Sequence, residues 1–445
     1  MADTAAVVGP LTHRRVLRIA VPILLANATV PILGLVDTGV VGQMGEAAPI
    51  GAVGIGAIIL TSVYWIFGFL RMGTSGLAAQ AHGAGDSMET GAILMRALLI
   101  GVAAGLALIV LQLPLMAAAF RIAPASADVE TLARDYLTIR IWGAPATIAL
   151  YAVTGWLIAV ERTSGVLGLQ LWMNGLNIGL DLLFVLGLGW GVEGVAIATL
   201  MAEWSALALG LWLCRGAFAS GAWRNHARIL DPARLRRMLQ VNGDIMVRTV
   251  ALQASFTSFL FIGAGFGDVT LAANQVLLQF LHVVAFALDG FAFAAEALVG
   301  QAVGARSVAA LRRAGILTSL WGLGAALVMA AGFWLLGPLL IDVMAKQAEV
   351  QALARSYLPW VVLGAVISLA SYMLDGIFIG ATATREMRNA MLVSAALYGL
   401  SLPLLLGPFE NHGLWAALML LNLARGVTMG LYYPRVERRA RAAAA

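Results

Sequence analysis

The stretch Leu33-Gly34-Leu35-Val36-Asp37-Thr38-Gly39-Val40-Val41-Gly42 places one carboxylate inside an apolar run that extends from Val16 to Gly42. Such a run can cross a bilayer, which takes roughly 20 helical residues. An Asp near the centre of a spanning helix costs on the order of 2.5–3.5 kcal/mol on insertion scales, so its side chain should face protein or water. We therefore interpret Asp37 as an ion or proton site. The alternative is a residue that only joins two helices by hydrogen bonds.

The composition also predicts a membrane protein. Apolar residues make up 61% of the 445 residues and charged residues 11%, whereas soluble domains carry about 25% charged residues. The mean hydropathy is +0.89. We expect an all-α polytopic membrane protein of the cell (inner) membrane, surrounded by the lipid bilayer.

Charge and cysteine content argue against several other classes. The pI of about 9.7 could suggest nucleic acid, but the arginines lie between apolar runs, as membrane topology requires, so no nucleic-acid partner is predicted. The one cysteine, Cys214, rules out a disulfide framework and a multi-cysteine metal site. Residues Met1–Thr12 lack the pattern of a cleavable signal peptide, so the first span is expected to remain as an anchor.

Twelve apolar runs are predicted to span the membrane. The sixth and eleventh are the weakest, so ten to thirteen spans are compatible with the pattern. In order, the expected spans are Val16–Gly42, Ile50–Ala78, Ile93–Ala119, Tyr136–Ala159, Val166–Leu186, Val192–Leu213, Leu239–Gly263, Leu271–Val303, Ile316–Leu340, Tyr357–Ile379, Met391–Leu406 and Leu414–Tyr432.

The arginines predict the orientation of these spans. They cluster before the first span, after the fourth, sixth, eighth and tenth spans, and after the last. The alternate loops carry few basic residues, namely Arg121, Arg134, Lys346 and Arg355. Because positive loops stay on the inner side, both termini are predicted to be cytoplasmic.

The two halves of the chain share a repeat. Adding 221 to Gln80, Gly83, Tyr136 and Tyr151 leads to Gln301, Gly304, Tyr357 and Tyr372, with matching neighbours in each case. A repeat of this length indicates two six-helix halves, and an even helix number relates them by a pseudo-two-fold axis along the membrane normal, as in alternating-access transporters. We predict an N-terminal lobe at residues 1–215, a cytoplasmic linker at 216–237 and a C-terminal lobe at 238–445.

A polar face is predicted in the fifth span. Asn174, Asn177 and Asp181 recur at i, i+3 and i+7, on one helical face, and Thr199 and Glu203 share a face in the sixth span. Their oxygens suit a hard cation such as Na⁺, and two acids in one apolar cavity favour proton binding. The alternative is an interhelical hydrogen-bond network without an ion.

The second half carries a different polar set. At the offset of 221, neither Asp37 nor Asp181 has an acidic counterpart. Arg248 lies one helical turn after Asp244 and is expected to neutralise it. The other buried arginines cannot be paired from spacing alone. The polar residues in question are Asp244, Arg248, Asp289, Glu296 and Asp375, with Arg71, Arg140 and Arg425 as candidate partners.

No cofactor or catalytic motif is found. The five histidines lack metal-ligand spacing, and Gly51–Gly56 does not follow a strand, which argues against a phosphate loop. No nucleophile and base stand out, so no enzyme and no catalytic residue is expected. Without an ATP-binding motif, any pumping must draw on an ion gradient.

Several motifs resemble those of multidrug and toxic compound extrusion (MATE) transporters. The six-plus-six repeat, Val36–Gly42, and Asn177 with Asp181 resemble the family as a whole. The DinF (DNA-damage-inducible) branch is similar at Phe67–Met72, Asn242–Arg248, Leu288–Ala297 and Leu374–Thr382.

The resemblance covers nearly the whole chain. It implies a V-shaped bundle that expels organic cations and other toxic compounds in exchange for H⁺ or Na⁺. It carries the family's cation site, where Na⁺ could bind, onto Asp37, Asn177, Asp181 and Thr199, with Tyr136 nearby.

Two function classes stay open. The first is a gradient-driven antiporter that acts as a monomer on small-molecule drugs or toxic organic cations. An additional polar pathway would use Asn174, Glu203, Asp289, Glu296, Asp375, Arg71 and Arg248. The second is a flippase for a lipid-linked precursor, which would hold a diphosphate on buried arginines. A membrane-embedded enzyme is a third and weaker alternative.

Overall fold

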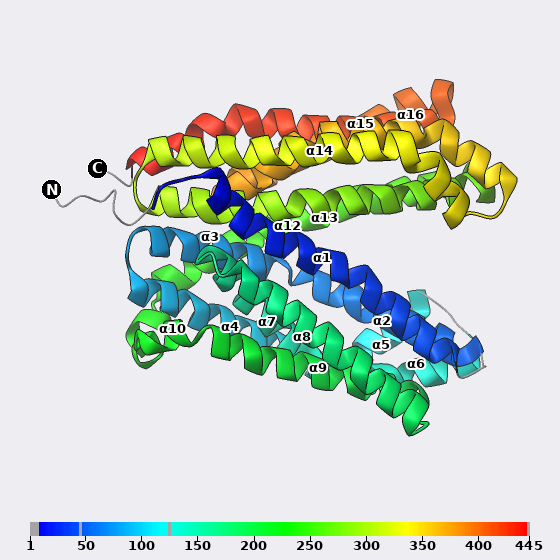
Figure 1. The fold of residues 1–445 in the computed structure, drawn as a ribbon, viewed down its shortest axis with the longest axis horizontal. Helices are drawn as coiled ribbons and strands as arrows, with labels where there is room; N and C mark the ends of the chain where they lie inside the picture. Colours follow the sequence, from blue (N-terminus) through cyan, green and yellow to red (C-terminus); the bar gives the residue numbers. More distant parts are fainter. Residues whose placement is uncertain (1–8, 44–46, 123–125, 443–445) are drawn as a thin grey trace. The chain divides into compact units, whose positions relative to one another are not determined.

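The computed structural model of the chain describes the backbone of residues 9–43, 47–122 and 126–442, and within them all side chains except those of residues 30–35, 37, 38, 47, 122 and 442. Helices and short turns account for these residues, and no strand occurs among them (Figure 1). The first half contains α1 (His13–Gly42), α2 (Ala47–Ile66), α3 (Phe69–Gly83), α4 (Ser87–Val110), α5 (Gln112–Ile122), α6 (Ala127–Arg140), α7 (Ala144–Ala159), α8 (Thr163–Asp181) and α9 (Gly191–Leu213).

The second half has fewer and longer helices. A connecting segment with α10 (Arg215–Ala219) and α11 (His226–Ile229) leads into them. They are α12 (Pro232–Ala264), α13 (Asp268–Gly304), α14 (Val308–Met344), α15 (Ala348–Gly380) and α16 (Thr384–Ala442). Short non-α segments are η2 (Ile141–Gly143) and η4 (Ala222–Arg224), both 3-10, and η3 (Leu182–Gly187), which is π-helical.

Ten helical segments of the described residues are long and apolar enough to cross a membrane. The last of them, residues 384–441, is far longer than the roughly 20 residues that one crossing needs. Its helix breaks at Glu410, where φ is +47°. The two predicted spans Met391–Leu406 and Leu414–Tyr432 therefore lie on either side of a real interruption.

The chain folds into two compact units. We call Leu25–Ala78 with Asp86–Met238 the N-terminal unit. The C-terminal unit consists of Ala79–Gly85 and the described parts of Met1–Leu24 and Leu239–Ala445. The connecting segment up to Met238 thus packs within the N-terminal unit, and α1, α3 and α12 each contribute residues to both units.

Small residues let the helices of each unit pack closely. In the N-terminal unit, α4 crosses α7 at Gly101 and Gly105. A Cβ at Gly105 would overlap the backbone of Pro145, and one at Gly101 would lie only 3.2 Å from the backbone of Ala149. In the C-terminal unit, Gly376 and Gly380 of α15 lie in the same way against the carbonyls of Ala292 and Glu296 on α13. Both pairs have the Gly-x-x-x-Gly spacing that favours close helix approach in membranes.

The repeat is visible in these contacts. Gly155 of α7 faces the carbonyl of Arg71, and its equivalent Gly376 faces the carbonyl of Ala292. Both partners differ by the same 221 residues as the glycines themselves. Equivalent positions in the two halves therefore make equivalent backbone contacts.

Candidate functional site

The polar face of α8 meets α9 inside the N-terminal unit. The Asn177 amide nitrogen donates a hydrogen bond of 3.0 Å to the Thr199 hydroxyl. That hydroxyl donates in turn to the carbonyl of Val195 at 2.9 Å, one turn earlier on α9. Asn177 is buried, and its Oδ1 accepts no hydrogen bond from any described residue. A buried amide oxygen in this state can serve as a ligand for a hard cation.

Asp181 lies one turn beyond Asn177 on the same face of α8 and is fully buried. The helix changes character directly after it, because Leu182–Gly187 is π-helical and the Leu188 amide donates to the carbonyl of Leu183 at 2.9 Å. π-Helical turns occur frequently at functional sites. The buried carboxylate therefore sits at a local irregularity in an apolar helix.

Asn174 has a different environment from Asn177. Its amide nitrogen donates to the Thr29 hydroxyl of α1 at 3.0 Å. Its Oδ1 accepts from Gln170 at 3.0 Å. These bonds engage both ends of the amide, so Asn174 joins α8 to α1 and offers less to an ion than Asn177.

Glu203 is held by an arginine from another helix. Arg140, at the end of α6, donates two hydrogen bonds to the Glu203 carboxylate at 2.7 and 2.9 Å. Both side chains are buried, and Tyr64 and Tyr136 lie close enough to interact electrostatically with the guanidinium. A buried, bidentate pair of this kind is already neutral as a unit. Glu203 is therefore bound to Arg140, a pairing that spacing alone could not give.

Two predicted residues are located with less detail. Asp37 belongs to α1, but its side chain lies outside the described residues. Arg71 belongs to α3 and is buried, with its backbone carbonyl against Gly155 of α7. Both positions lie within the N-terminal unit.

The C-terminal unit has its own buried charge cluster. Asp375 of α15 accepts through one oxygen, Oδ2, from Arg248 of α12 and from Arg425 of α16, the latter at 2.6 Å. Arg425 also donates to the Asn422 Oδ1 at 3.1 Å. All three charged side chains are at most 10% exposed. The cluster therefore ties three helices together around one carboxylate.

The expected pairing of Arg248 with Asp244 is wrong. Asp244 instead accepts from Arg388 of α16 at 2.6 Å and from the Thr384 hydroxyl at 3.2 Å. Tertiary contacts with α15 and α16 override the neighbour at helical spacing. Of the two remaining acids, Glu296 is buried on α13 and Asp289 is half-buried two turns earlier.

Sequence reasoning missed two polar features of the C-terminal unit. Asn274 and Asn411 exchange two amide hydrogen bonds at 2.8 and 3.0 Å, and Trp415 donates to the same Asn274 oxygen at 2.9 Å. Asn242 is buried, and neither end of its amide bonds a described residue. The sequence signals were Asn242 at the start of the motif Asn242–Arg248 and Asn411 between Glu410 and His412, and neither reveals a partner for its amide.

Among the described residues, no group of three or more His, Cys, Asp or Glu side chains could hold a metal ion. The polar face of α8 and α9 offers a different donor set, with one amide oxygen, one hydroxyl and one carboxylate. Such oxygens suit an alkali cation or a proton rather than a transition metal.

Buried polar clusters inside long apolar helices are typical of polytopic membrane proteins with a functional site inside the membrane. The model of the MatE family matches residues 22–183 and again residues 245–405. The chain is 37% identical to DNA damage-inducible protein F of Escherichia coli (strain K12) over 434 residues, which cover 94% of this chain and 91% of the relative. The chain therefore belongs to the MatE family, whose members are membrane transporters and not enzymes.

Other relatives agree with this assignment. The chain is 25% identical to the probable multidrug resistance protein NorM of Synechocystis over 433 residues, or 90% of each chain. Its fold is similar to that of the Vibrio cholerae MATE transporter VcmN in the bent form, with a TM-score of 0.85, 20% identity and full coverage of both chains. The resemblance to MATE transporters and to their DinF branch is thus confirmed.

Proposed function

We propose that this chain is a cation-coupled antiporter that exports organic cations and other toxic compounds by alternating access. H⁺ or Na⁺ is the coupling ion, and no cofactor takes part. The family assignment supports small-molecule export, and relatives bear the name multidrug resistance protein. The coupling site comprises Asp37, Asn177, Asp181 and Thr199.

The observation that carries this proposal is the buried polar face of α8 and α9. Asp181 is fully buried in a helix that crosses the bilayer, next to an Asn177 oxygen that no described residue occupies. Burial disfavours the charged form of a carboxylate, and we infer that a proton or a bound cation stabilises this face. Glu203 is left outside the site because Arg140 already neutralises it.

The proposed architecture has twelve spans in two six-helix halves with a pseudo-two-fold axis along the membrane normal. The double match of one family model and the equivalent glycine contacts support it. We retain a cytoplasmic linker at 216–237, both termini in the cytoplasm, the inner membrane as the location and a monomeric protein. Tags at both ends that react only from the cytoplasmic side would support this topology, and a tag that reacts from outside would refute it.

Transport by the purified protein tests the proposed function. Liposomes containing the protein are loaded with a fluorescent organic cation and exposed in turn to a pH gradient and a Na⁺ gradient. We expect substrate movement with one of the two and none without a gradient. Equal movement without any gradient would refute the coupling.

A flippase for a lipid-linked precursor is the second candidate, since Arg248 and Arg425 share a single carboxylate. The two functions respond oppositely to a pair of variants. The antiporter loses coupled export in Asp37→Asn. A flippase tolerates that change and loses activity in Arg248→Gln. The names of the relatives favour the antiporter.

A further inference from the structure

A groove of about 510 Å³ lies between α4 and the connecting segment, entirely within the N-terminal unit. One wall consists of Met95, Leu98, Leu99 and Val102. These positions recur at i, i+3, i+4 and i+7 and so share one face of α4. Leu99 and Val102 are exposed on the surface of the protein. Because α4 is long and apolar enough to cross a membrane, we expect this exposed apolar wall to face lipid.

The opposite wall comes from the connecting segment, through Trp223 and His226 among others. This segment approaches α4 closely at Gly91, where a Cβ would lie 2.9 Å from the Ala222 Cβ and 3.0 Å from the Ala217 carbonyl oxygen. Ala222 and Ile229 pack on Ala92 of α4 to form a small apolar core beside the groove. The groove is therefore bounded by packed elements on both sides.

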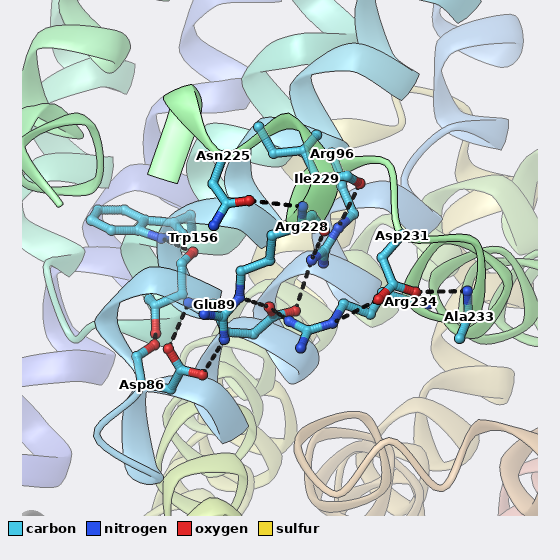
Figure 2. Close-up of polar contacts among 11 residues, drawn as sticks. Asp86, Glu89, Arg96, Trp156, Asn225, Arg228, Ile229, Asp231, Ala233 and Arg234 are labelled. Atoms are coloured by element: carbon cyan, nitrogen blue, oxygen red, sulfur yellow. Dashed lines mark hydrogen bonds and ion pairs between the residues drawn. The ribbon is translucent and has the colours of Figure 1, made fainter. Parts of the chain in front are cut away.

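An ionic cluster holds the connecting segment in this position (Figure 2). Glu89, in the first turn of α4, accepts from Arg96 and Arg228 at 2.9 Å each and also from Arg234. Arg96 donates through Nε to the carbonyl of Ile229 at 3.1 Å. Asp86 accepts from Arg228 as well. The charged side chains of this cluster therefore bind one another and are not available to a ligand.

The rim of the groove carries an arginine side chain that does not belong to this ionic cluster. The Arg224 guanidinium lies over the Trp223 ring, 4.7 Å from its centroid, and forms no ion pair with any described acid. Arg224 and His226 are both exposed. An apolar groove that faces lipid thus ends at a Trp, an Arg and a His, residue types that suit the membrane interface.

We propose that this groove binds one anionic phospholipid. An acyl chain lies along Leu99 and Val102, and the phosphate accepts hydrogen bonds from Arg224 and His226. A guanidinium forms strong charge-assisted bonds with phosphate oxygens, and basic segments near the inner surface attract anionic lipids. The proposal rests on the cytoplasmic placement of the connecting segment in the proposed topology.

Trp223 provides a reporter for lipid in the groove. The full-length protein in neutral detergent is titrated with phosphatidylglycerol or phosphatidylcholine that carries brominated acyl chains, which quench nearby tryptophans. Subtracting the signal of Trp223→Phe from that of the parent isolates this indole among twelve tryptophans. Trp334→Phe, an exposed tryptophan on α14, is the matched control. Inorganic phosphate is added as a competitor without acyl chains.

We expect saturable quenching of Trp223 by phosphatidylglycerol and weaker quenching by phosphatidylcholine. Arg224→Gln should weaken phosphatidylglycerol binding about fivefold, the effect of one interfacial charge. Arg236→Gln, which removes an exposed charge from the same region, should leave it unchanged. Leu99→Phe should reduce binding of both lipids by filling the groove.

Equal affinity for the two lipids, or unchanged phosphatidylglycerol binding in an Arg224→Gln/His226→Gln double variant, would overturn the proposal. Displacement by inorganic phosphate alone would show a simple anion site and would also overturn it. The measurement needs neither transport nor membrane orientation, so its failure is distinguishable from failure of the proposed antiport.

Discussion

The Asn177 amide and the Thr199 hydroxyl are 3.0 Å apart and join α8 to α9 beside the buried Asp181 carboxylate. The Thr199 hydroxyl donates its proton to the Val195 carbonyl and accepts from the Asn177 amide nitrogen, which leaves the Asn177 oxygen without a hydrogen bond from any described residue. The bond therefore orients a site as well as packing two helices.

We expect Thr199→Val to weaken this site without unfolding the protein. The change keeps the volume but removes the acceptor, so the Asn177 amide can rotate. The apparent affinity of transport for the coupling ion should fall about five- to tenfold, corresponding to roughly 1–1.4 kcal/mol. Export rates measured against ion concentration test this. Ser205→Ala, which removes another α9 hydroxyl, is the control. An unchanged apparent affinity for the coupling ion in Thr199→Val would show that the Asn177–Thr199 hydrogen bond only packs the two helices.

Gly83 and Gly304 make reciprocal backbone contacts within the C-terminal unit. A Cβ at Gly83 would overlap the Gln301 carbonyl, and a Cβ at the equivalent Gly304 would overlap the Gln80 carbonyl. We predict that Gly304→Ala lowers the free energy of unfolding by about 1–3 kcal/mol, the usual cost of overpacking. A Cβ at Gly324 would meet open space, so Gly324→Ala should not lower the free energy of unfolding. Thermal unfolding in detergent compares the two, and equal stability would refute the close approach.

Asp375 should be important for folding because it separates two buried arginines. Replacing it by Asn leaves Arg248 and Arg425 without their shared carboxylate. Removing one partner from a buried charge pair costs about 3–5 kcal/mol. We expect Asp375→Asn to unfold at a clearly lower temperature and the double variant Asp375→Asn/Arg248→Gln to recover part of the loss. A double-mutant cycle measures the coupling. Strictly additive effects would contradict the pairing.

Cys214 predicts a dependence on pH. Burial at the end of α9 raises the pKa of its thiol to about 12, although Arg162 acts in the opposite direction. The folded protein should therefore resist thiol alkylation between pH 7 and pH 9, whereas an unfolded thiol with a pKa of about 8.5 reacts readily at pH 9.

The sign of the stability effect follows from the same shift. Above about pH 8.5 the unfolded chain releases the Cys214 proton and the folded protein retains it, so this group favours unfolding as the pH rises. The rate of Cys214 alkylation in native and in denatured protein, measured from pH 7 to pH 9, tests the difference in thiol pKa on which both predictions depend. Rapid labelling of the native protein at pH 8 would contradict them.

The sequence predicted the class of fold and the family because membrane spans and a repeat of 221 residues leave direct patterns. It also identified Asn177 and Asp181 as sharing a buried face, since helical periodicity determines which residues lie together. It could not distinguish Asn174, which binds Thr29, from Asn177, because both are amides on the same face.

Ion pairs between distant helices were beyond prediction. Arg248 pairs with Asp375 and not with its neighbour Asp244, and Arg140 pairs with Glu203. Tertiary packing brings these groups together in a low-dielectric interior. The π-helical turn after Asp181 also depends on packing, and no local sequence signal is strong enough to position it. The break at Glu410, by contrast, falls between the predicted spans Met391–Leu406 and Leu414–Tyr432.

The central claim is that the buried Asp181 carboxylate couples the ion to export. Its most direct test is gradient-driven export of a fluorescent organic cation from proteoliposomes containing Asp181→Asn. Asp342→Asn, which changes a half-buried acid at the end of α14 that pairs with Arg355, is the matched control. We predict that export falls more than about tenfold in Asp181→Asn, a loss above 1.4 kcal/mol, and is unchanged in the control. Export by Asp181→Asn at the parental rate, with the same dependence on the gradient, would contradict the account.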